Sequence, residues 1–403
     1  MNDPQSLRDT PFPRFVCSQT ADFLAYHMLT VAVGWQVYDI TGSAMSLGLV
    51  GLAQFLPQVL LTLVVGHVAD RFERRRVVMA CQAALLAVAG LLAFGSHAGA
   101  LTESMMLACA CLMGAARSFV HPTMSAYLPS LIEPRQLPRA LALSASARQS
   151  GIIIGPALGG ALYATGAPVV YAACALAFCL SIAALSGIRA SRPARPREPL
   201  SLAYLMGGIT YIKSKPEVLG AISLDLFSVL LGGATALLPI FARDILHAGP
   251  LGLGLLRAAP AVGALCMSLY LARTPMTRRV GLKMFAAVGL FGTATIVFGL
   301  STSFGLSLAA LCVLGASDMV SVVVRSSLVQ LETPDDMRGR VSAVNSVFIG
   351  TSNQLGEFES GLTAAWFGAE AAVVLGGVCT ILVVLLWMRL FPALRRRESL
   401  VAR

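Results

Sequence analysis

Roughly twelve apolar segments, each about as long as a bilayer is thick, occupy most of this 403-residue chain. A helix needs about 20 apolar residues to cross the hydrocarbon core, and its backbone polar groups must be satisfied within the segment. Only 12% of the residues are charged, about half the fraction of a soluble domain. The predicted helical spans are 14–39, 43–69, 76–96, 102–126, 140–164, 168–188, 216–241, 250–273, 281–301, 305–329, 341–366 and 370–390.

The positions of the basic residues predict the orientation of these spans. With both termini in the cytoplasm, nearly all of the 30 Lys and Arg fall in cytoplasmic loops, at span ends or in the tails, and only Arg243 falls in an external loop. This asymmetry is the positive-inside pattern of membrane proteins. The net charge of +10 therefore follows from topology, and we expect no nucleic-acid partner.

The chain is internally repeated. A shift of 201 residues aligns the fourth span with the tenth and the fifth with the eleventh, and it superposes Gly155 on Gly356 and Gly160 on Gly361. Such a repeat is typical of transporters, whose substrate sites lie between the repeats. We therefore predict an all-α membrane protein with an N-terminal six-helix half, a cytoplasmic linker rich in Pro and Arg, and a C-terminal six-helix half. Their bounds are 1–188, 189–215 and 216–403.

The loop after the second span, G-H-V-A-D-R-F-E-R-R-R, resembles the signature loop of the major facilitator superfamily, G-x-x-x-D-R-x-G-R-R. The matching residues are Gly66, Asp70, Arg71, Arg74 and Arg75, whereas Glu73 stands where the family usually has Gly. An acidic residue among arginines can form charge-assisted hydrogen bonds. The resemblance implies a cytoplasmic network that holds one conformation closed.

The fifth span, G-I-I-I-G-P-A-L-G-G, resembles the motif of drug/proton antiporters in the same superfamily. The matching residues are Gly151, Gly155, Pro156, Gly159 and Gly160. Small residues let helices approach closely, and a proline bends a helix. We expect Gly155 and Gly159 to pack against the other half, in the eighth span. Generic small-residue packing is the alternative.

Further matches, at residues 35–43, 119–129 and 337–341, make nearly the whole chain similar to the enterobactin-exporter-like branch of bacterial drug and siderophore exporters. The resemblance implies a monomeric inner-membrane antiporter that exports a small amphipathic or hydrophobic organic compound. It also implies a proton gradient as the driving force. An importer or facilitated-diffusion carrier is one alternative, and a non-transporting membrane scaffold or sensor is another.

Ionisable residues inside the spans are the candidate functional residues, because a charge near the bilayer centre costs about 2.5–3.5 kcal/mol on insertion scales. Spans 1, 4, 7 and 10 line the central cavity in the superfamily, and each carries a polar stripe here. A proton-coupled exporter needs a carboxylate that changes its charge near ambient pH. The candidates for proton coupling or substrate binding are Asp22, Tyr26, Arg117, His121, Asp225, Asp318, Arg325, Glu357 and Glu359.

Two further expectations concern chemistry and pairing. The sequence has no phosphate-binding G-x-x-x-x-G-K-[ST] loop, no metal-ligand cluster and no nucleophile–base constellation, so we predict neither an enzyme nor a cofactor. The repeat places Arg117 and Asp318 at equivalent positions. Because opposite charges at that depth need partners, we predict that these two residues pair across the cavity in at least one conformation.

Overall fold

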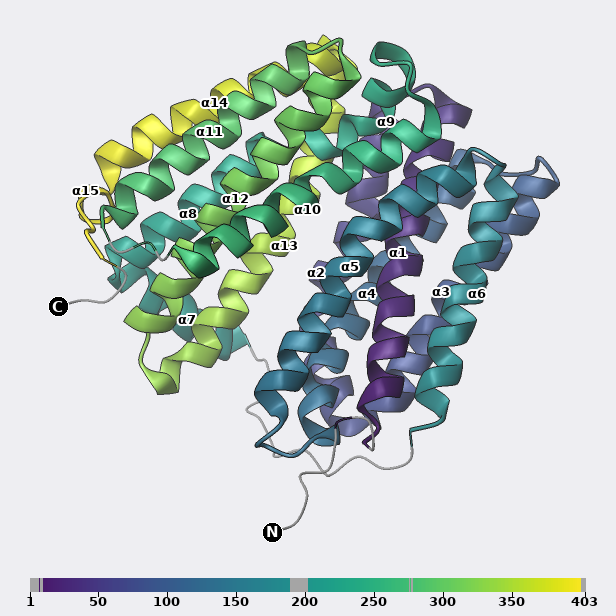
Figure 1. Ribbon diagram of the computed structural model, residues 1–403, viewed down its shortest axis with the longest axis horizontal. Coiled ribbons are helices and arrows are strands. Elements are labelled where there is room, and N and C mark those ends of the chain that lie inside the picture. Colours follow the sequence, from purple (N-terminus) through teal and green to yellow (C-terminus); the bar gives the residue numbers. More distant parts are fainter. Residues whose placement is uncertain (1–6, 8–9, 189–201, 275, 277, 400–403) are drawn as a thin grey trace. The chain divides into compact units, whose positions relative to one another are not determined.

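The computed structural model describes residue 7 and residues 10–188, 202–274, 276 and 278–399, which contain helices and no β-strand (Figure 1). The first half comprises α1 (Phe12–Thr41), α2 (Ala44–Arg71), α3 (Arg74–His97), α4 (Glu103–Leu131), α5 (Leu137–Tyr163) and α6 (Ala167–Ser186). The remaining helices are α7 (Leu202–Ser214), α8 (Pro216–Leu231), α9 (Leu238–Ile240), α10 (Gly249–Arg273), α11 (Val280–Leu300), α12 (Phe304–Glu332), α13 (Asp335–Phe367), α14 (Ala369–Leu390) and α15 (Pro392–Arg395).

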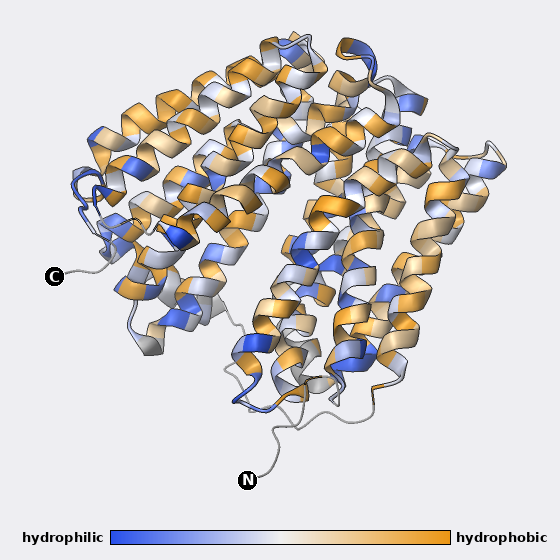
Figure 2. Cartoon of the chain, viewed as in Figure 1, coloured by the Kyte–Doolittle hydropathy of each residue, from blue (hydrophilic) through white to orange (hydrophobic). Residues whose placement is uncertain are grey.

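Every predicted span corresponds to helical structure. Within the described residues, nine helical segments are long and apolar enough to cross a membrane. The other three long helices, α1, α5 and α13, contain 30, 27 and 33 residues and carry more polar side chains. Large apolar side chains such as Phe94 and Leu300 are about 70% exposed (73% and 69%), and orange, hydrophobic residues dominate the helices in Figure 2. Such a surface suits lipid rather than water.

The seventh span differs from the continuous helix that we predicted over 216–241. α8 ends at Leu231, and the chain continues through a 3₁₀ turn (Ala234–Leu237), α9 and a π turn (Phe241–Ile245). Gly232 and Gly233 lie at the break, and glycines there weaken a helix. A Cβ on Gly233 would lie 2.8 Å from the Gly356 carbonyl oxygen of α13. The break therefore lets the backbone pass close to α13.

The described helices form two compact units, which we treat separately. One comprises Met1–Ile40, Leu56–Leu200 and Gly249–Ala258. In it α3 packs between α4 and α6, and Phe15 of α1 meets Tyr127 of α4 edge to face at 6.1 Å in a fully apolar cluster. Close van der Waals packing of these side chains holds the helices together, because the surrounding lipid is as apolar as they are and gives no hydrophobic driving force.

The second unit comprises Thr41–Phe55, Ser201–Ala248 and Ala259–Arg403. Here α11 packs against α12 and α14, and α8 packs against α13 and α14. The predicted linker falls in two parts. Residues 189–201 lie outside the described residues, whereas residues 202–214 form α7, which packs on α13.

The glycine contacts follow the internal repeat. Gly155 of α5 meets α1, and its repeat equivalent Gly356 of α13 meets α8. Gly160 of α5 meets the first turns of α10, and its equivalent Gly361 of α13 meets Gly48 near the start of α2. Each of these four contacts lies within one unit. Equivalent residues thus contact equivalent helices, which confirms the two pseudo-symmetric halves.

Candidate functional site

The first unit holds a buried ion pair between α1 and α4. Asp22 is 0% exposed, and its Oδ2 lies 3.1 Å from Nη1 of Arg117. Gln82 of α3 donates a hydrogen bond to Oδ1 of Asp22 at 3.4 Å. Both carboxylate oxygens therefore have donors, as a buried charge requires.

Two aromatic rings cover the Arg117 guanidinium. Its central carbon lies 4.4 Å from the ring centroid of Phe23 and 4.5 Å from that of Tyr26, within the range of a cation–π contact. Phe23 and Tyr26 stand one and four residues beyond Asp22 on α1. One turn of α1 thus supplies both the counter-charge and the aromatic surroundings of Arg117.

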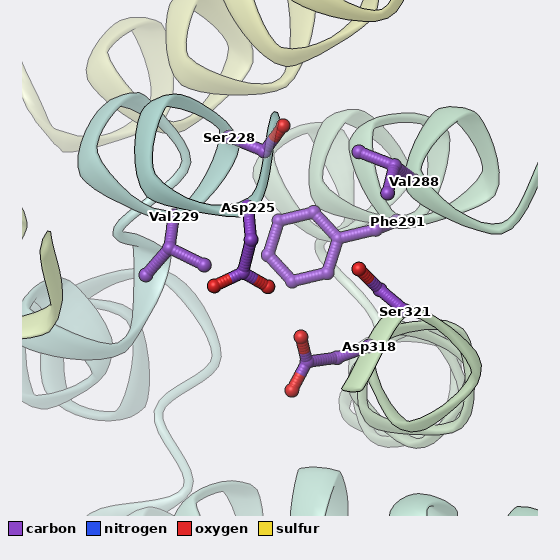
Figure 3. A pocket seen from close by; sticks show the side chains of 7 residues that line it. All are labelled: Asp225, Ser228, Val229, Val288, Phe291, Asp318 and Ser321. Atoms are coloured by element: carbon purple, nitrogen blue, oxygen red, sulfur yellow. The ribbon is translucent and has the colours of Figure 1, made fainter. Parts of the chain in front are cut away.

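The second unit holds a similar buried pair between α8 and α12. Arg325 donates to Oδ2 of Asp225, and the two side chains are only 4% and 6% exposed. Asp318 lies two turns before Arg325 on α12 and lines a pocket together with Asp225 (Figure 3). The lining residues are Asp225, Ser228, Val229, Val288, Phe291, Asp318 and Ser321.

The two pairs occupy equivalent helices, since α1 and α4 in the first half correspond to α8 and α12 in the second. The sequence placed all four residues on polar stripes but did not pair them this way. Asp22 faces Arg117 and Gln82 inside its own unit rather than open water. The pairing of Arg117 with Asp318 stays a prediction, which the double charge reversal Arg117→Asp with Asp318→Arg would test.

Glu357 and Glu359 are not gathered with these pairs. His121 is exposed, but it stands one turn beyond Arg117 on α4 and interacts electrostatically with it. Glu359 accepts a hydrogen bond from Thr363 of its own helix at 2.8 Å. Glu357 lies against α2, because a Cβ on Gly51 would lie 2.9 Å from the Glu357 Cβ. The two glutamates thus have different surroundings, as expected for residues two positions apart.

The signature loop is described in part. Backbone positions show that α2 runs through Gly66 and Asp70 and ends at Arg71, whose side chains lie outside the described residues. Arg74 donates to the Ala126 carbonyl at 2.8 Å, and Arg75 donates to the Ile188 carbonyl at 2.7 Å. Arg74 thus adds a donor to a carbonyl in the last two turns of α4, and Arg75 binds a carbonyl just beyond the end of α6, where the helical hydrogen-bond pattern has ended.

Glu73, where the family usually has Gly, also has a defined role in this loop. Its two carboxylate oxygens lie 3.1 Å from Nε of Arg75 and 2.8 Å from Nε of Arg76. The departure from the family pattern therefore adds an acidic partner between α2 and α3. The energetic effect is small, because exposed ion pairs contribute about 0–1 kcal/mol.

The glycines of α5 pack in two directions. A Cβ would lie 2.7 Å from the Phe23 Cβ at Gly151, 2.7 Å from the His27 Cβ at Gly155, and 2.9 Å from the Met28 Cα at Gly159. Our prediction that Gly155 and Gly159 face the eighth span is therefore wrong, because three of the motif glycines lie along α1. Gly160 meets α10 at Pro250 and Gly254, and the carbonyl oxygen of Pro156 also lies against Gly254.

A basic residue near the C-terminus forms a network that the sequence pattern did not reveal. Arg397 Nη1 lies 2.7 Å from Oε2 of Glu217 at the start of α8, and Nη2 binds Glu332 at the end of α12. The Gly281 amide of α11 donates to the Arg397 carbonyl at 3.0 Å. In sequence Arg397 is one of three consecutive arginines, which by themselves indicate only a cytoplasmic tail.

Comparison with known proteins gives the family. The family model for transmembrane secretion effectors matches residues 6–402. The enterobactin exporter EntS of Citrobacter koseri is 28% identical over 372 residues, which cover 90% of this chain and 85% of that protein. EntS of Shigella boydii is 27% identical over 380 residues, covering 92% and 89%.

Solved structures agree on the fold. The nucleoside transporter NupG, in a mutant form, has a TM-score of 0.73 at 13% identity and covers 94% of this chain and 100% of its own. The D-xylose-proton symporter has a TM-score of 0.71 at 12% identity, with coverages of 96% and 99%. The chain therefore belongs to the transmembrane secretion effectors of the major facilitator superfamily, and it is a multi-pass membrane transporter of small molecules rather than an enzyme.

Proposed function

We propose that this transporter exports a small amphipathic or hydrophobic organic compound of the siderophore or drug class in exchange for protons. Relatives described as enterobactin exporters, similar over about nine-tenths of the chain, support a siderophore. The glycine–proline motif of α5, from Gly151 to Gly160, supports the outward direction. The proton gradient is then the only energy source, and no cofactor takes part.

The observation that carries this proposal is a buried carboxylate–guanidinium contact between equivalent helices in each unit, Asp22 with Arg117 and Asp225 with Arg325. A guanidinium keeps its proton in proteins, whereas a carboxylate can become neutral. Proton binding at Asp22 or Asp225 removes the charge that holds Arg117 or Arg325. Each arginine is then available to a polar or anionic group of the substrate.

The remaining sequence predictions fit this reading and belong to the proposal. The protein acts as a monomer in the bacterial inner membrane, with both termini cytoplasmic and with halves at 1–188 and 216–403. Asp70 and Arg71 at the end of α2, together with Arg74 and Arg75 at the start of α3, hold one conformation closed on the cytoplasmic side. Asp318, Glu357 and Glu359 are additional proton-binding candidates.

Transport by inside-out membrane vesicles tests the proposal. Vesicles from cells that overproduce the protein and lack their own siderophore exporter should accumulate enterobactin when their interior is acidified, and a protonophore should abolish accumulation. Asp225→Asn should abolish transport, because Asn cannot exchange the proton. Asp244→Asn is the matched control, since Asp244 is 48% exposed in an ion pair with Arg243.

Other outcomes separate the alternatives. Accumulation that persists with the protonophore and stops at equal concentrations indicates facilitated diffusion. Loss of enterobactin from preloaded vesicles under the same gradient indicates an importer. The absence of movement for enterobactin and for a panel of lipophilic drugs, with correctly inserted protein, would favour a scaffold or sensor and contradict the proposal.

A further inference from the structure

The pocket between α8, α11 and α12 has a composition that export alone does not explain. It has a cavity volume of about 10 Å³, room for one water-sized ligand, and is lined on one side by Val288 and Phe291 of α11. Oxygen atoms of Asp225, Asp318 and Ser321 line the other side, as Figure 3 shows. All of these residues belong to the second compact unit.

The charges of this pocket do not balance. Asp225 and Asp318 contribute two negative charges, and Arg325 contributes one positive charge through its contact with Oδ2 of Asp225. Among the described residues, no hydrogen bond or ion pair is formed by Asp318. With both carboxyl groups ionised the local sum is −1, and either a bound proton or a bound monovalent cation brings it to zero, in surroundings where an unbalanced charge costs several kcal/mol.

A second observation, independent of the carboxylates, points to a ligand. Ser321 is 2% exposed, and its hydroxyl has no hydrogen-bond partner. In Figure 3 this hydroxyl points towards the ring of Phe291, and the carboxylates of Asp225 and Asp318 line the same pocket. A buried hydroxyl without a partner is unfavourable, so its orientation is explained if a ligand occupies the space.

The chemistry of the donors selects the ligand. Carboxylate and hydroxyl oxygens are hard donors, which suit alkali and alkaline-earth cations rather than soft metals. One monovalent cation brings the charge of the pocket to zero, whereas a divalent cation leaves an excess of +1 beside Arg325. The apolar wall of Val288 and Phe291 leaves no room on that side for further charged ligands.

We propose that this pocket is a binding site for one alkali cation, with Na⁺ as the probe, held by Asp318, the free oxygen of Asp225 and the hydroxyl of Ser321. The proposal deepens the proposed function, because the ion occupies the carboxylates assigned there to the proton. Binding is measured without substrate, so it fails or succeeds independently of export.

The test is Na⁺ titration of the purified full-length protein in detergent by calorimetry, with choline chloride keeping the ionic strength constant. The wild-type protein should bind one Na⁺, and choline should not reproduce the heat. Asp318→Asn should weaken Na⁺ binding at least about tenfold, which corresponds to ~1.4 kcal/mol. Ser321→Ala should weaken it by a smaller factor.

Ser317→Ala is the matched control. Ser317 is also 2% exposed with an unpartnered hydroxyl and stands beside Asp318 on α12, but it does not line the pocket. Its Na⁺ affinity should equal that of the wild-type protein. If Asp318→Asn fails to fold, the comparison of Ser321→Ala with Ser317→Ala still decides. Absence of Na⁺ binding, binding of protons without Na⁺, or equal effects of the two serine substitutions would overturn the proposal.

Discussion

Removing the carboxylate of Asp225 should leave the buried guanidinium of Arg325 without its ion-pair partner. The two side chains are 6% and 4% exposed, so water cannot replace the lost partner. Breaking one side of such a buried pair costs about 3–5 kcal/mol, because the remaining charge stays desolvated. Asp318 lies two turns before Arg325 and, within the described part of the chain, forms no ion pair with it, so it does not replace Asp225, and the expected cost of Asp225→Asn is about 3–5 kcal/mol.

The assay is unfolding of the purified protein by a denaturing detergent, with the free energy of unfolding compared between variants. The exposed pair of Arg243 with Asp244, at 3.9 Å and with side chains 40% and 48% exposed, supplies the control, and Asp244→Asn should cost less than about 1 kcal/mol. The double variant Asp225→Asn with Arg325→Gln should recover part of the loss, since no buried charge remains unpaired.

Equal costs for Asp225→Asn and Asp244→Asn would refute this reasoning. So would a double variant whose loss equals the sum of the two single losses, because the coupling energy would then be zero. Either result would mean that Arg325 and Asp225 are neighbours without a stabilising contact.

Three further predictions follow from the packing and the loops. Gly160→Ala should lower the free energy of unfolding by about 1–3 kcal/mol through overpacking against Pro250. Gly90→Ala, with open space at its Cβ, should leave the free energy of detergent-induced unfolding unchanged or raise it. Equal effects of the two substitutions would contradict the close contact. Asp70→Asn should slow export without reducing membrane insertion, and unchanged turnover would remove its proposed role as a latch. Arg117→Lys should keep the charge but weaken export, because an ammonium lacks the flat face that stacks on two rings; wild-type transport rates would argue against that role.

Much of the fold was predictable because hydrophobic length is a strong signal. Lipid forces each apolar run into a helix, and the basic loops indicate on which side each run ends. The break after Leu231 was not predictable from this signal, since adjacent glycines such as Gly232 and Gly233 are also found inside unbroken helices. It depends on how closely α13 approaches, which only the packed structure provides.

The candidate site, too, was predictable from the sequence only in part. Sequence located the charged residues, because each is rare and costly within a span. It did not pair them, because the partner of Arg117 depends on the rotation of α1 and α4 about their own axes. Asp22 and Asp318 were equally plausible partners on charge alone. The glycines of α5 were recognised by their resemblance to a family motif, but the face they present to α1 required the coordinates.

The contacts of Arg397 bear on how the second unit is assembled during synthesis. Glu217 at the start of α8 is made 180 residues before the arginine that binds it, and Glu332 is made 65 residues before. Because chains fold from the N-terminus as the ribosome extends them, α8 and α12 enter the membrane before the arginine that binds both carboxylates has been synthesised. The helices at this end of the bundle are therefore joined only after they have been inserted. A chain whose synthesis stops before residue 397 lacks the contacts of Arg397 with Glu217 and Glu332.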